Sequence, residues 1–320
     1  LALLASLARE ILTLAKLAKS AKETESQPRQ LKASMQLHSQ AEPVYFPEAD
    51  QQSVLRLGLH VIPIEQWLHL DEDFSLFQQH KLASLQKHPE KVYAELPGAG
   101  NACDEFGEFL RDHLQSHWGQ QFSLEQSGLS HIPTGLNWPT QPRSLWESSL
   151  WIQDDICLLE LAQEQDEYIM TAASLCSPSN WKLEDKIGKS IDWIHEPVPG
   201  YKEQLAKRVN KLISGMAPVK PVMRFNWSLQ PGNELCWRSD LDSGSGDGDY
   251  YWRVERQTLL KLPQSGAVVF AIRIFLHSLT QMDQLGNFRQ RLAAIVSRQS
   301  AEMLRYKGMD HKLLERLKCE

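Results

Sequence analysis

The stretch from Cys176 to Gly200 contains one histidine, His195, at a position suited to presenting a single ligand. It follows the apolar residues Ile191 and Ile194 and stands directly before the sequence EPVPG. Because Glu196 precedes a proline, it is disfavoured in helical dihedral angles, and a helix over these residues should end about there. His195 is therefore predicted on the last helical turn, where its imidazole could bind a cofactor or its metal. The alternative is a buried histidine whose ring is satisfied by a backbone carbonyl.

Polar side chains alternate along three strands predicted in the carboxyl-terminal half. Arg224 and Asn226 share one side of the first strand, and Glu255 lies on the second. Arg273 is unusual because it interrupts the apolar run VVFAIRIF of the third strand. Burying a guanidinium costs several kcal/mol unless it meets an acceptor. The structural alternative to a role in binding is therefore an Arg273–Glu255 ion pair on the outer face of the sheet.

Two further histidines have a spacing that could serve a metal. His113 and His117 are four residues apart in a predicted helix, which places two imidazoles on one face. No third ligand and no HExxH pattern accompanies them. The polar sequence DHLQSH favours a solvated helix face instead.

The elements that must position these residues indicate an α+β fold. An amphipathic helix over Tyr201–Met216 is followed by three predicted antiparallel strands, Val222–Gln230, Tyr251–Lys261 and Ala267–Leu279. Apolar residues spaced three to four apart predict helices over Trp67–Phe77 and Phe106–Trp118. Two further helices, Met282–Arg305 and His311–Lys318, are expected to pack outside the sheet.

The middle of the chain is expected to contain a loop and two strands. Residues 120–147 include five prolines and glycines and are predicted to form a surface loop. In the following run, SLWIQDDICLLE, Asp154 and Asp155 are adjacent. Successive side chains of a strand point to opposite faces, so we expect one carboxylate in solvent and the other inward as a hydrogen-bond acceptor or cap. The sequence EYIMTAASLC predicts the second strand.

Composition excludes some classes of function. The 320 residues include 34 basic and 40 acidic side chains, a formal charge of −6, with no dominant basic run. Nucleic acid is therefore not expected as a partner. The five cysteines are odd in number, scattered, and without a C-x-x-C pair. This pattern favours free thiols in a reducing compartment and argues against an intrinsic iron–sulfur cluster or structural zinc site.

The amino-terminal residues differ from the rest. Residues 1–44 are interpreted as an amphipathic segment followed by a polar linker, and residues 45–320 as one domain. Arg9 and Glu10 interrupt the first apolar run well short of the roughly 20 residues that span a bilayer. We expect a cytoplasmic protein. The alternatives are a mitochondrial location or membrane association through the amino-terminal segment.

A series of short motifs resembles a known family. SPSNW, KIG, IHEPVPG, RFNW, RVERQTLLKLP and YKG occur in this order, preceded by LGLHVIPIEQWLHLDEDF and SLWIQDDICLLE. Over roughly residues 45–318 the chain resembles the α subunit of haem-dependent oxidative N-demethylase, the dimethylamine monooxygenase family. The resemblance implies a PAS-like haem-binding domain, namely an antiparallel sheet with flanking helices and helical additions at both ends. It also implies oxidation of a small secondary amine such as dimethylamine by O2, with electrons from a partner reductase carrying FMN and a 2Fe–2S cluster.

Under this resemblance the candidate residues acquire roles. His195 would be the axial ligand of haem b, with Lys182 and Lys186 reaching its propionates. Arg224 and Asn226 have donors suited to polarising bound oxygen, while Glu255 could hold the ammonium form of the amine or accept its proton. Solvated lysines are the alternative for Lys182 and Lys186. Arg273 completes the set of candidate catalytic residues.

The position of the ligand departs from the familiar haem PAS pattern. There the ligand lies on the long helix before the sheet, whereas residues 201–216 contain no histidine. His195 lies just upstream and remains the favoured ligand, with His277 and His131 as rivals. A non-catalytic haem or ligand sensor on the same scaffold is the alternative function.

Overall fold

The computed structural model describes residues 43–47, 57–162, 164, 166–238, 240–241, 249–307 and 309. All of them belong to one compact unit. The amphipathic segment and most of the linker predicted over residues 1–44 lie outside this part of the chain, as does the helix predicted over His311–Lys318. Four cysteines, 103, 157, 176 and 236, are described, and all four are free thiols, as predicted.

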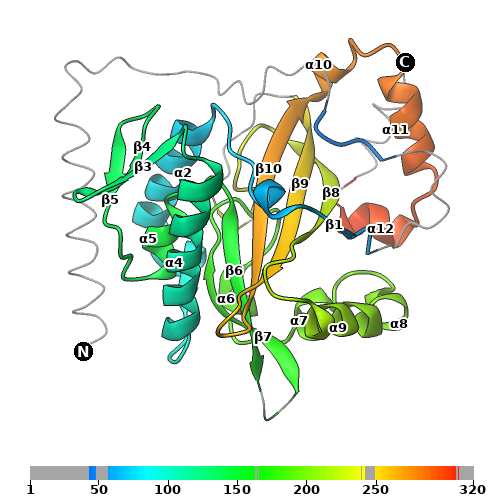
Figure 1. Cartoon of the computed structure of the whole chain (residues 1–320). Helices are drawn as coiled ribbons and strands as arrows, with labels where there is room; N and C mark the ends of the chain where they lie inside the picture. Colours follow the sequence, from blue (N-terminus) through cyan, green and yellow to red (C-terminus); the bar gives the residue numbers. More distant parts are fainter. Residues whose placement is uncertain are drawn as a thin grey trace. The chain divides into compact units, whose positions relative to one another are not determined.

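A seven-stranded antiparallel sheet forms the centre of the fold (Figure 1). Its strand order is β1-β8-β9-β10-β6-β7-β2. The last long strand, β10, therefore returns to pair with β6, so that the β6–β7 hairpin and the β8–β9–β10 meander form one sheet. The strands are β1 (His60–Val61), β2 (Tyr93–Glu95), β6 (Asp155–Ala162), β7 (Glu167–Ser174), β8 (Val222–Pro231), β9 (Tyr250–Lys261) and β10 (Val268–Ser278). The α+β class and the three consecutive carboxyl-terminal strands are confirmed.

The strand register assigns polar residues to two faces. Asn226 pairs with Glu255, and Glu255 pairs with Ile274 on its other side. Directly opposed residues point to the same side of a sheet, so Arg224, Asn226 and Glu255 share one face, here called the α7 face. Arg273 pairs with Arg256 and lies on the opposite face, here called the α4 face.

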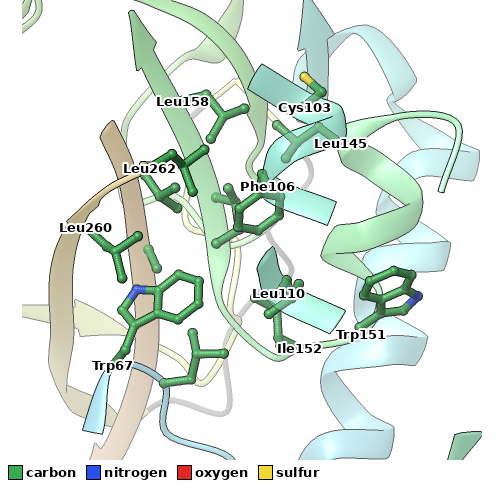
Figure 2. Packing of buried hydrophobic residues seen from close by; sticks show 14 of the residues in the cluster. Trp67, Cys103, Phe106, Leu110, Leu145, Trp151, Ile152, Leu158, Leu260 and Leu262 are labelled. Carbon is green, nitrogen blue, oxygen red and sulfur yellow. The ribbon is translucent and has the colours of Figure 1, made fainter. Parts of the chain in front are cut away.

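The α4 face carries the largest apolar core. Helix α4 (Gly100–His117) places Cys103, Phe106, Leu110 and Leu114 at helical spacing, all buried. Figure 2 shows Phe106 and Leu110 in one cluster with Leu158 of β6 and Leu260 of β9, with Leu110 beside Ile152. Full burial of each such side chain contributes about 1.5–3 kcal/mol to stability. The described residues before β6 also form α2 (Phe74–Lys87), α3 (Pro89–Val92), α5 (Leu145–Ser149) and the 3-10 turn η1 (Ile64–Gln66).

The α7 face is covered by short helices between β7 and β8. Ile191 and Ile194 pack with Cys157 and Leu159 of β6 in a second apolar cluster. The helices are α6 (Leu183–Lys186), α7 (Ile191–His195), α8 (Tyr201–Gln204) and α9 (Ala206–Gly215). The single helix predicted over Tyr201–Met216 is therefore two helices, because Leu205 adopts φ −118° and closes the first of them.

The carboxyl-terminal helices are also shorter than predicted. The helix expected over Met282–Arg305 is divided into α10 (Leu279–Met282), α11 (Phe288–Val296) and α12 (Ala301–Tyr306). The hydroxyls of Ser278 and Ser300 accept hydrogen bonds from backbone N–H groups in the first turns of α10 and α12, so the chain restarts a helix at each. Phe288 and Leu292 of α11 are buried beside Trp252.

Two other predictions were wrong. Residues 120–147 contain a second sheet of three strands, β3 (Phe122–Glu125), β4 (Gly128–His131) and β5 (Leu136–Trp138), rather than a loop alone. The helix predicted over Trp67–Phe77 begins only at Phe74. Trp67 is instead fully buried in the core on the α4 face.

Candidate functional site

His195 is the last residue of α7, as predicted from the sequence. The side chain of Ser190 caps the helix by accepting a hydrogen bond from the Trp193 N–H. Glu196 caps the end of α7 and retains helical dihedral angles, φ −49° and ψ −39°, although it precedes a proline. The imidazole stacks on Tyr201, with ring centroids 4.9 Å apart.

The hydrogen bond of His195 fixes which ring nitrogen carries the proton. Nδ1 lies 2.8 Å from the carbonyl oxygen of Ile191. Since a carbonyl only accepts, Nδ1 donates, and the lone pair lies on Nε2. No described residue hydrogen-bonds to Nε2. A histidine with a purely structural role was expected to make this hydrogen bond to a backbone carbonyl. The bond uses only Nδ1, however, so Nε2 remains available as a metal ligand.

The surroundings of His195 favour its neutral form. Burial lowers the pKa of the imidazole, and the positive charges of Arg224 and Lys186 lower it further, against the opposing effect of the Ile191 carbonyl. A neutral imidazole is the form that binds a metal. The positive charge of Arg224, on the α7 face of β8, therefore acts on the imidazole of His195.

One N–H group of the Arg224 guanidinium lacks a hydrogen-bond acceptor among the described residues. Its Nε is buried and has no hydrogen-bond partner within the described part of the chain. Burial lowers the pKa of the guanidinium, while the carboxylate of Glu255 opposes that effect. A buried guanidinium N–H without an acceptor costs about 1–3 kcal/mol, and such a group is well placed to donate to a bound ligand.

Glu255 lies at the centre of a polar network on the α7 face. Its Oε2 accepts hydrogen bonds from Asn226 Nδ2 at 3.1 Å and Gln257 Nε2 at 3.0 Å. Its Oε1 accepts from Nε of Arg253 at 3.3 Å. Arg253 is itself fully buried, and its Nη groups donate to Gln230 Oε1, the Leu235 carbonyl and the Ser177 carbonyl. Asn226 and Glu255 are thus in contact, and the register places Arg224 on the same face. Strand alternation had predicted that Arg224 and Asn226 share one side of their strand.

Arg273 does not belong to this group, and the predicted Arg273–Glu255 pair was wrong. Arg273 points to the α4 face, where its Nη2 lies 2.9 Å from both carboxylate oxygens of Asp71. The guanidinium is fully buried between the rings of Phe77 and Phe275. Asp71 precedes α2 and was not recognised from the sequence, because no local pattern connects positions 202 residues apart.

The two candidate lysines occupy different surroundings. Lys186 donates to the carbonyl of Ile194 at 3.3 Å and lies 4.7 Å from the ring centroid of Trp193. It is therefore close to the helix that carries His195. Lys182 forms the cap before α6 and lies 3.5 Å from a carboxylate oxygen of Asp240.

The rival histidines lie away from the α7 face. His277 lies on the α4 face of β10 and accepts a hydrogen bond from the Val44 N–H at 3.4 Å. His131 stacks on Phe74 and contacts Thr134. His113 is buried against Trp67, so the solvated helix face predicted for it was wrong. Within the described residues, no group of three or more His, Cys, Asp or Glu side chains is arranged to hold a metal ion.

Asp154 and Asp155 point to opposite faces, as predicted, but both are buried. Asp155 accepts hydrogen bonds from the backbone N–H groups of Cys176 and Ser177, at 3.0 and 2.7 Å. The expectation that one carboxylate is solvated was wrong. Lys81, also fully buried, donates to the Asp154 carbonyl at 2.6 Å and compensates part of the buried negative charge.

The Asp154 carboxyl gives a pH-dependent contribution to stability. Both of its oxygens are buried without a hydrogen-bond partner in the described residues, and burial raises its pKa to about 6, against the opposing charge of Arg273. The folded state therefore binds a proton more tightly than the unfolded state, so this contribution decreases as pH rises from about 4 to 6. We expect Asp154→Asn to raise the free energy of unfolding at pH 7 by up to about 3 kcal/mol.

Urea unfolding at pH 4 and pH 7 measures this effect. The gain from Asp154→Asn should be largest at pH 7 and should nearly disappear at pH 4. Asp185→Asn, which changes a carboxylate exposed on α6, is the matched control and should leave stability nearly unchanged. A variant less stable than the unchanged chain at pH 7 would contradict the interpretation.

Lys307, which follows α12, was not predicted from the sequence as a residue of the site. Its ammonium group contacts Asn226 and the backbone of β8. The only signal for it was the YKG motif at residues 306–308, for which no pattern gave a role.

No helix of the described residues is both long and apolar enough to cross a membrane.

A model of the family described as haem-dependent oxidative N-demethylase, alpha subunit-like, matches residues 58–314. The match includes every element that carries His195, Arg224, Asn226 and Glu255. The chain therefore belongs to the haem-dependent oxidative N-demethylase alpha subunit-like family.

Proposed function

We propose that the chain is the haem-binding subunit of an oxidative N-demethylase for a small secondary amine such as dimethylamine. Two groups carry the proposal: His195, whose Nε2 lone pair is available, and Arg224 of the α7 face, whose Nε has no hydrogen-bond partner among the described residues. A histidine ligand held by a backbone carbonyl and a nearby donor are the two protein groups that a haem oxygenase site requires.

The residues present fit haem b. His195 would hold the iron through Nε2, and Lys186 would contact a propionate; Lys182 is proposed for the second propionate, in exchange for its ion pair with Asp240. When bound, haem supplies the oxygen and electron chemistry of the oxidation. The helix α9 followed by β8, β9 and β10 supports the proposal that the scaffold is PAS-like.

Each polar residue of the α7 face has a distinct proposed task. Arg224 offers an N–H that no described residue uses, and it would donate a hydrogen bond to the substrate O2. Asn226 is engaged with Glu255 through one side-chain N–H and retains the second for a ligand. Glu255 would orient the amine and accept its proton. Arg273 is assigned to the structure of the α4 face.

Electrons are proposed to come from separate subunits that carry FMN and a 2Fe–2S cluster. The four described cysteines are dispersed and free, so a cluster on this chain is not part of the proposal. The alpha subunit-like description of the family also supports further components. We propose a cytoplasmic location.

Titration of the purified full chain with haemin tests the cofactor. We expect one equivalent to give a Soret band that shifts on reduction. Formaldehyde should then be released from dimethylamine in the presence of NADPH and a flavin and iron–sulfur reductase. Failure to take up haem would contradict the proposal, whereas haem uptake and reversible oxygen binding without turnover would support the sensor alternative.

Arg224→Gln is expected to lower kcat/KM for the amine roughly 100-fold, because a preorganised donor of this type contributes that much or more to turnover. Haem should still bind, since His195 is unchanged. Arg208→Gln, on the exposed surface of α9, is the control and should retain full activity. Equal kcat/KM values for Arg224→Gln and the unchanged enzyme would remove Arg224 from the mechanism.

A further inference from the structure

Lys307 links the carboxyl-terminal helices to the polar network of the α7 face. The residue ends α12, and its Nζ donates to the backbone carbonyl of Trp227 at 2.5 Å and to Asn226 Oδ1 at 3.4 Å. Nζ also lies 4.2 Å from the centroid of the Trp227 ring. Three contacts from different groups fix the position of one ammonium group.

Within the part of the chain that the structure describes, β8 has no strand partner on its outer edge at this point. The pairing of β1 with β8 comprises Val222 and Met223, and no described strand continues it farther along. Trp227 lies beyond the end of that pairing, and Lys307 supplies a donor for its carbonyl. An edge carbonyl satisfied by a side chain in this way ties α12 to the sheet.

The ammonium group also determines the orientation of the Asn226 amide. Lys307 can only donate, so it must face the side-chain oxygen of Asn226. The nitrogen then faces Glu255, to which it donates at 3.1 Å. Rotating the amide by 180° would place two donors together at Lys307 and two acceptors together at Glu255.

We propose that Lys307 is a positioning residue for the amine site, acting through Asn226 to hold Glu255 in its orientation. The inference rests on the proposed function for the role of Glu255 and extends it to a residue outside the sheet. Lys307 does not touch the reacting groups. Its charge and its hydrogen bond to Asn226 preserve the arrangement that Glu255 needs to receive an amine.

The charges around Lys307 support its coupling to the site. Burial lowers the pKa of its ammonium group to about 8, Glu255 opposes that change, and Arg224 adds to it. Tyr306, the preceding residue, is coupled to the same two side chains, and burial raises the pKa of its phenol. Glu255, Arg224 and Tyr306 are therefore the ionisable groups that act on Lys307.

Kinetics of Lys307→Met and Lys307→Arg in the haem-loaded enzyme test the inference. We expect Lys307→Met to raise KM for dimethylamine roughly 10- to 100-fold, as for loss of a hydrogen bond from a charged group, while the Soret band is unchanged. In the unchanged enzyme, kcat/KM should decrease above about pH 8 as Lys307 loses its proton. Lys307→Arg should restore KM and retain activity at higher pH, because a guanidinium stays protonated.

Lys261→Met is the matched control. Lys261 lies on β9 and donates to the Ser214 carbonyl, away from the network, so its replacement should leave KM and the pH profile unchanged. An unchanged KM in Lys307→Met, or the same alkaline decrease in Lys307→Arg as in the unchanged enzyme, would overturn the role of Lys307.

Lysine NMR separates this inference from the proposed function. The protein labelled at the lysine Cε is titrated without haem, and the resonance of Lys307 is identified by its absence in Lys307→Arg. Glu255→Gln should lower the titration midpoint of Lys307, and Arg224→Gln should raise it. A midpoint that neither variant moves overturns the coupling even if haem binds. The two expected shifts support it even if no amine is oxidised.

Discussion

Replacing His195 with alanine is expected to abolish stoichiometric ligation of haem by the chain. Among the described residues of the α7 face, the His195 imidazole has a ring nitrogen that is unprotonated and free of hydrogen bonds, and the positive charge of Arg224 favours its neutral form. Removing it leaves the apolar helix contacts of Ile191 and Ile194 in place. The Soret band should lose intensity and shift, while the far-ultraviolet circular dichroism stays unchanged.

Added imidazole provides a sharp control for the His195→Ala experiment. A small ligand entering the space of the deleted ring should restore the spectrum of the unchanged protein. His131→Gln, which alters a buried histidine of the small three-stranded sheet, should keep the normal haem spectrum. If His195→Ala retains an unaltered spectrum, the ligand lies elsewhere, and His277 becomes the next candidate.

Much of the candidate site could be predicted because its rules are local. Alternation along a strand placed Arg224 and Asn226 on one face without knowledge of the partner strands. The proline after Glu196 and the apolar spacing before it placed His195 at the end of a helix. These signals act over a few residues, and the structure retains them.

The contacts that join distant segments could not be predicted in this way. The register between β9 and β10 decides whether Arg273 faces Glu255 or Asp71, and a shift of one residue exchanges the two faces. Lys307 is 81 residues from Asn226, and its contact depends on where β1 ends. Residues 120–147 form strands because their neighbours bury Phe122 and Leu129, which outweighs the local preference for turns.

Arg273→Met is expected to lower the free energy of unfolding by up to about 3–5 kcal/mol, because it removes the buried cation from the partly exposed carboxylate of Asp71. The guanidinium also donates to the Ile274 carbonyl at 2.6 Å, and its central carbon Cζ lies 4.0 Å from the centroid of the Phe77 ring. Methionine retains the apolar volume but none of these donors. Urea unfolding at pH 7 measures the loss, and haem binding at low temperature should persist because Arg273 lies on the α4 face.

Double replacement distinguishes a structural ion pair from a catalytic arginine. If the loss comes from an unpaired Asp71, then Asp71→Leu combined with Arg273→Met should recover part of it, since removing both charges also removes their cost of burial. Asp71 also accepts hydrogen bonds from Gln153 and the Asp73 N–H, so the recovery should be incomplete. If Arg273→Met alone retained full stability but showed a large decrease in kcat, Arg273 would instead have a catalytic role. That result would require the guanidinium to act across the sheet from Glu255, which the strand register opposes.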